Sequence, residues 1–83
     1  VPTYPKLALN NEWEGTVKVN VTVSSTGKPI QVTVISSSGY ETLDNSFIRA
    51  IQNSYQFKPK RVMGNNVVGV ITLSYSFTLG GQK

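Results

Sequence analysis

The sequence contains no cysteine and no histidine among its 83 residues. Without cysteine, no disulfide can support the fold, and the redox compartment cannot be read from the chain. A Ser–His–Asp or Cys–His nucleophile cannot be assembled, and a zinc site lacks its usual ligands. The sequence therefore predicts a protein that is not an enzyme and that holds no metal or cofactor.

Carboxylates are also few. The chain has eight Lys or Arg residues, a net charge of +4, and only four acids, Glu12, Glu14, Glu41 and Asp44. Glu12 and Glu14 flank Trp13 and would point apart in an extended segment, which favours surface charge over an acid–base pair. The one basic cluster, Lys58 to Arg61, lacks the dense stripe with interleaved aromatics that nucleic-acid binding requires. No nucleic-acid partner is expected.

Long apolar runs are missing as well. No segment approaches the roughly 18–20 apolar residues that cross a bilayer, and no signal-peptide pattern is present. The first residue is Val rather than Met, which suggests a fragment of a longer chain whose anchor lies outside it. Residues 1–83 leave room for one domain only, with a modest core.

Two neighbouring segments alternate between apolar and polar residues, which is the signature of half-buried strands. Over residues 16–24 the apolar set is Val17, Val19, Val21 and Val23. Ile30, Val32 and Val34 resume the alternation to about Ser36. The intervening residues 25–29 contain Gly27, which can adopt positive φ in a turn. Together they predict a β-hairpin.

The sequence predicts two helices. The first 15 residues carry Pro2 and Pro5, which suit a helix start, and Gly15 is a plausible C-terminal cap. Farther on, apolar residues recur at spacings of three and four, as on an amphipathic helix of about fourteen residues. They are Leu43, Phe47, Ile48, Ala50, Ile51 and Tyr55. Thr42 or Asp44 is expected to cap this helix, and Lys58-Pro59 to end it. A basic loop follows.

The longest strand signal closes the chain, from Val67 to Leu79. One parity is apolar from Ile71 to Leu79, and the other carries Thr and Ser. After Gly69 the strand has no Lys, Glu, Asp or Pro, the residues that usually protect an exposed sheet edge. It must be paired on both sides or leave an edge that another chain can join.

The predicted order is helix, strand, strand, helix, strand. It favours an α+β two-layer sandwich, with a three-stranded antiparallel sheet and both helices on one face. A right-handed crossover would place the first strand in the middle and the last strand at an edge. Most aromatics are expected in the core, and Trp13 fits either the core or a partly exposed contact.

Several short motifs occur in an order that resembles the C-terminal domain of the TonB energy-transducer family. They are Tyr4-Pro5, Ala8, Glu14-Gly15, the strand from Val17 to Val23, Gly27, Val32, Val34, Ser37-Ser38-Gly39, Leu43-Asp44, Ala50, Tyr55-Gln56-Phe57-Lys58-Pro59 and Phe77-Thr78-Leu79. The resemblance spans about residues 2–79. Departures include Tyr55, where the family often has Trp, and Thr26, where it has Asp or Asn before the turn glycine.

The resemblance implies a periplasmic domain, anchored to the inner membrane by a segment outside this chain. It implies that an ExbB–ExbD-type motor acts through the protein. The domain would grip the TonB box of outer-membrane transporters by strand addition, for uptake of iron chelates or vitamin B12. The partner-binding residues implied are Tyr4, Pro5, Leu73, Ser74, Tyr75, Ser76, Phe77, Thr78 and Leu79. An unpaired edge also allows a homodimer of the fragment.

Other kinds of protein also fit these residues. A haem-uptake TonB-like protein or a TolA-like envelope domain would share the fold and differ in its partner. A small non-catalytic inhibitor or structural module would instead bury or cap its last strand.

Overall fold

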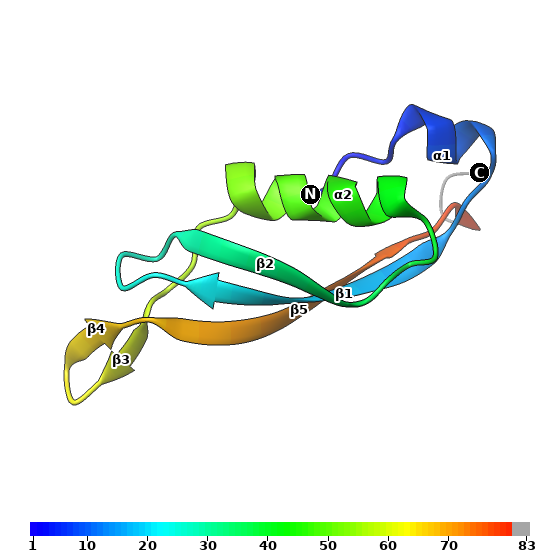
Figure 1. The fold of residues 1–83 in the computed structure, drawn as a ribbon. Helices are drawn as coiled ribbons and strands as arrows, with labels where there is room; N and C mark the ends of the chain where they lie inside the picture. The colour runs from blue at the N-terminus through cyan, green and yellow to red at the C-terminus, as the bar shows by residue number, and fades with distance from the viewer. Residues whose placement is uncertain (81–83) are drawn as a thin grey trace.

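The structure, a computed structural model, describes residues 1–80. Its elements, in chain order, are α1 (Lys6–Asn10), β1 (Gly15–Val23), β2 (Pro29–Ser36), α2 (Glu41–Ser54), β3 (Lys60–Val62), β4 (Asn65–Val67) and β5 (Gly69–Phe77). The molecule is elongated, with extents of 48 × 21 × 18 Å. Figure 1 shows α2 lying along one face of the main sheet, with α1 at one end and the β3–β4 hairpin at the other.

The main sheet has the order β2-β1-β5, so the first strand lies in the middle as expected. Both neighbours are antiparallel to β1. Along β5 the pairing is regular over nine residues, from Gly15 opposite Phe77 to Val23 opposite Gly69. The predicted α+β class, with a three-stranded antiparallel sheet and two helices, is confirmed; α2 covers one face of the sheet and α1 lies at one end (Figure 1).

The core lies between α2 and the face of β1 that carries the alternating valines. Its buried apolar residues are Ala8, Val17, Val19, Val21, Val23, Leu43, Phe47, Ile51 and Phe77. Tyr4, Trp13, Tyr55, Phe57, Leu73 and Tyr75 pack around them and remain partly exposed. No helix of the described residues is long and apolar enough to cross a membrane.

The first helix ends earlier than predicted. Trp13 donates its N–H to Ala8 O at 2.9 Å and Glu12 to Leu9 O at 3.1 Å, while Glu12 has φ +55°. This is a Schellman-type ending with a glutamate in the left-handed position. The prediction that Gly15 caps α1 is wrong. Gly15 begins β1, where a Cβ would collide with the carbonyl oxygen of Ser38.

The second helix has the predicted length of 14 residues but a different start. Its N-cap is Tyr40, with no side-chain cap, so the prediction that Thr42 or Asp44 caps it is wrong. Asp44 instead accepts hydrogen bonds from the preceding loop: from Ser37 Oγ, from Ser38 N at 2.9 Å and from Ser38 Oγ at 2.7 Å. The helix ends at Ser54, ahead of Lys58-Pro59.

The basic segment predicted to be a loop is a second hairpin, β3–β4. Its turn residues Met63 and Gly64 have φ values of +51° and +84°, as a two-residue type I′ turn requires. Val67 belongs to β4, and β5 runs from Gly69 to Phe77. The predicted final strand is therefore about two residues too long at each end.

Candidate partner-binding site

The last strand, β5, forms one border of the main sheet. It pairs with β1, and no other strand of the described residues pairs with its second side. It spans nine residues and carries no charged residue and no proline. Natural sheets usually protect such a border with charges, proline or a covering loop. An open border of this length can accept an extended segment from another chain.

A hydrogen bond at the β1–β2 turn shows which backbone groups of β5 point away from β1. Ser24 donates its N–H to Lys28 O at 2.8 Å, so the backbone of Ser24 points toward β2. Backbone groups alternate along an antiparallel strand. The backbone N–H and C=O groups of the odd-numbered residues of β1, including Val19, therefore point toward β5.

The register carries this alternation to the border. Val19 pairs with Leu73 and Val17 with Tyr75, so Leu73 and Tyr75 exchange backbone hydrogen bonds with β1. The residues between them must point their N–H and C=O groups away from β1. These outward-pointing residues, called here the open-edge set, are Val70, Thr72, Ser74 and Ser76.

Side-chain contacts agree with this assignment. Thr16 Oγ1 lies 2.8 Å from Ser76 Oγ, and Thr72 Oγ1 donates to Asn20 Oδ1 at 2.7 Å. Each pair is directly opposite in the register. In an antiparallel pair, side chains come closer at positions that do not exchange backbone hydrogen bonds. The two contacts are therefore expected if Ser76 and Thr72 direct their backbone groups away from β1.

Tyr4 lies at the C-terminal end of β5. Its ring meets Phe77 edge to face, with centroids 5.3 Å apart, and its hydroxyl donates to Trp13 O. Burial, and next the charge of Glu14, raise the pKa of the Tyr4 phenol above 10.0. The phenol therefore stays protonated as a donor, and Tyr4 forms a half-buried wall beside the end of the strand.

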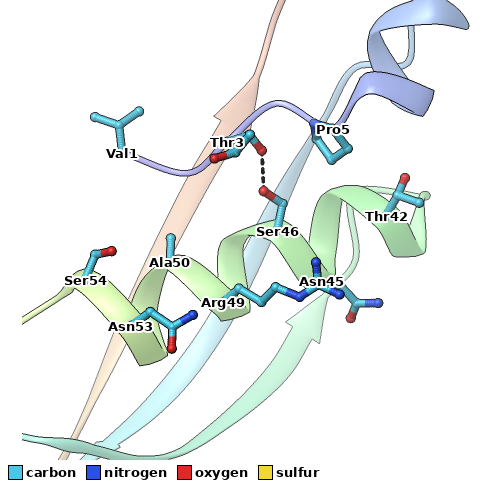
Figure 2. Close-up of a pocket in the computed structure, with 10 residues that line it drawn as sticks. All are labelled: Val1, Thr3, Pro5, Thr42, Asn45, Ser46, Arg49, Ala50, Asn53 and Ser54. Carbon is cyan, nitrogen blue, oxygen red and sulfur yellow. Dashed lines mark hydrogen bonds between the residues drawn. The ribbon is translucent and has the colours of Figure 1, made fainter.

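Pro5 occupies a different place. It precedes α1 and lines a cavity of about 520 Å³ between the N-terminal segment and α2 (Figure 2). In this cavity Ser46 Oγ donates to Thr3 O, which ties the N-terminal segment to the helix. Tyr4 and Pro5 are adjacent in sequence, yet they contact different elements.

Thr78 and Leu79 lie beyond β5. Leu79 donates its N–H to Glu14 Oε2 at 2.8 Å, which holds the chain beside the start of β1. The structure thus brings Tyr4, Phe77 and Leu79 to one end of the border, with Leu73 to Ser76 along it. The described residues contain no cluster of carboxylates suited to a metal ion.

A family model, Gram-negative bacterial TonB protein C-terminal, matches residues 1–79. The chain belongs to the TonB C-terminal family. Among its relatives is tonB2 of Pseudomonas aeruginosa, 35% identical over 78 residues that make up 94% of this chain and 28% of that protein. TonB of Vibrio cholerae is 35% identical over 80 residues, 96% of this chain and 32% of that protein.

The chain spans less than a third of the length of these TonB relatives. A solved structure of TonB2 from Vibrio anguillarum has the same fold, with a TM-score of 0.61 and 22% identity. The match covers 94% of this chain and 76% of the chain in that structure. The resemblance noted from the motifs is confirmed, and the open border of β5 belongs to a TonB C-terminal domain.

Two contributors to this end of the site were missed by sequence reasoning. Trp13 supplies the carbonyl that receives the Tyr4 hydroxyl, and its ring stacks on Tyr40 at 4.5 Å. Glu14 binds the Leu79 amide. Neither contact has a local sequence signal, because each joins segments that are distant along the chain.

Proposed function

We propose that this domain grips an extended segment, the TonB box of outer-membrane transporters, by adding it as a fourth strand beside β5. The observation that carries the proposal is the open-edge set, whose backbone groups face away from β1 along an uncharged strand and pair with no other strand in residues 1–80. Backbone hydrogen bonds supply the hold in this mode, so partners of varied sequence can be accepted.

Family membership supports a wider setting, which belongs to the same proposal. The domain works in the periplasm, and a segment outside this chain anchors it to the inner membrane. A proton-driven motor of the ExbB–ExbD type pulls through it and opens the transporter to iron chelates or vitamin B12. The domain itself catalyses no reaction.

The architecture suits such a load. A partner strand added beside β5 would join the sheet that already contains β1 and β2. Because the sheet order is β2-β1-β5, the partner would become the strand next to β5. Tension applied along the strands loads a row of backbone hydrogen bonds together. Tyr4, packed on Phe77, adds a side-chain contact at the end of that row.

An amide chemical-shift titration with TonB-box peptides tests the proposal. The expected shifts cluster on residues 70–79 and around Tyr4. The matched control is the same peptide with a central proline, which cannot complete the ladder. Absence of shifts with any TonB-box peptide would contradict the proposal and favour a closed structural module.

A homodimer through the same border would compete with the partner. Two β5 strands pairing edge to edge would give shifts on the open-edge set that depend on protein concentration without peptide. Sedimentation over a range of concentrations separates self-association from peptide binding.

A further inference from the structure

The two ends of this molecule differ in charge. All four carboxylates lie at the end that holds α1, the start of β1 and the start of α2. The Trp13–Tyr40 stack and the Glu14–Leu79 hydrogen bond join these segments there. No carboxylate occurs after Asp44 in the sequence.

The opposite end is basic. It is built from the β1–β2 turn and the β3–β4 hairpin, which lie at the same end of the molecule in Figure 1. Phe57 donates its N–H to Gly27 O at 3.1 Å, which holds the turn against the chain that leads into β3. This basic end carries Lys28, Lys58, Lys60 and Arg61.

Apolar side chains accompany these cations. Met63, at the tip of the hairpin, is 96% exposed, and Val70 is 64% exposed. Val62, Val68 and Ile71 are exposed to lesser degrees. These exposed side chains lie on the hairpin that carries Lys60 and Arg61 or just after it, at the start of β5.

The apolar residues point to both faces of the sheet. Ile71 is opposite the buried Val21, on the helix side, whereas its neighbour Val70 must point to the other side. A partner protein that docks on one face would leave the other uncovered. The interface of a bilayer can surround a projecting tip and bury both sides at once.

We propose that the basic end docks on the surface of an anionic phospholipid bilayer. The Met63 tip enters the headgroup region and the four cations bind lipid phosphates. Apolar contact combined with attraction to anionic lipid is the usual basis of interfacial binding. This contact meets the β5 border only at its first residues, Val70 and Ile71, and it does not depend on the function proposed above.

Vesicle sedimentation tests it with the 83-residue chain. Binding is expected to vesicles of phosphatidylcholine and phosphatidylglycerol in equal parts and not to phosphatidylcholine alone. Added salt should weaken it, because exposed charges are screened. Replacing both Lys58 and Lys60 with Gln should lower the partition constant about thirtyfold, or about fivefold for each cation.

The matched control substitutions are on α1, at the end opposite the basic end, or in the middle of β1. The pair Lys6→Gln and Lys18→Gln makes the same charge change and should alter binding little. Met63→Ser should weaken binding, whereas Leu7→Ser, which removes an exposed apolar side chain from α1, should not.

Two results would overturn the proposal. The first is that the unaltered chain does not bind vesicles containing phosphatidylglycerol. If it then binds polyglutamate in the same buffer, the basic end recognises acidic polypeptides instead. The second is an equal loss of binding in both lysine pairs, which would reflect net charge alone.

Discussion

The ring of Tyr4 meets the ring of Phe77 edge to face, with centroids 5.3 Å apart. The two residues come from opposite ends of the sequence. Phe77 is buried and ends β5, so Tyr4 connects the N-terminal segment to the border proposed to receive a partner. Stability and partner binding should therefore both respond to changes at Tyr4.

Tyr4→Phe should cost about 0.5–1.5 kcal/mol of unfolding free energy, because only the hydroxyl bond to Trp13 O is lost. Tyr4→Ala should cost more, since the edge-to-face contact is also removed. Urea unfolding of the two variants measures the difference. Equal costs would mean that the ring contact contributes nothing.

Phe47 should dominate the helix side of the core. It is buried and stacks on Tyr75 with centroids 5.7 Å apart. Phe47→Ala should cost about 3–5 kcal/mol. Gln52→Ala, an exposed position on the same helix, is the control and should stay within about 0.5 kcal/mol. A change near zero at Phe47 in thermal or urea unfolding would refute this account of the core.

Proline substitutions should separate the two sides of β5. Ser74→Pro removes an N–H that points to the open border, so we expect a loss of under about 1 kcal/mol in stability and weaker peptide binding. Ile71→Pro removes an N–H bonded to β1 and should cost about 1–3 kcal/mol. Ser74→Ala controls for the side chain. Comparable destabilisation by both prolines would show that the backbone directions are assigned wrongly.

Asp44 should make stability depend on acid pH. Burial acts to raise its pKa, but the hydrogen bonds from Ser37 and Ser38 outweigh burial and lower the pKa below 3.8. The folded state thus favours the carboxylate, and the contribution is complete above about pH 5. It is lost as the pH falls through the lowered pKa.

Asp44→Ala should cost about 1–3 kcal/mol at neutral pH, because the Ser37 and Ser38 donors lose their acceptor. The difference from the unaltered chain should shrink below about pH 4. Urea unfolding from pH 7 to pH 2 measures this trend. A difference that stays constant with pH would assign the cost to packing rather than to the carboxylate.

The sequence predicts the elements whose burial pattern is local. The four valines of β1 alternate without a break because one face meets α2, and the apolar spacing of α2 follows from the same core. Strand order was also predictable, since a helix separates the second and third predicted strands. These features need no knowledge of distant contacts.

The features that sequence reasoning missed depend on tertiary contacts or on exposed residues. Asp44 is a reasonable helix cap in sequence, but the folded loop offers it Ser37 and Ser38 instead. The β3–β4 hairpin has no buried face, so Lys60 to Val62 show no apolar alternation. Its turn also uses Met63-Gly64 rather than the usual Asn-Gly. The Tyr4–Phe77 contact has no local signal.

The most direct test of the open border is amide hydrogen exchange along β5, measured residue by residue with and without a TonB-box peptide. In the free domain the amides of Leu73 and Tyr75 should exchange slowly and those of Thr72, Ser74 and Ser76 quickly. With peptide the second group should become protected. Protection of all these amides in the free domain, or no change on adding peptide, would contradict strand addition at β5.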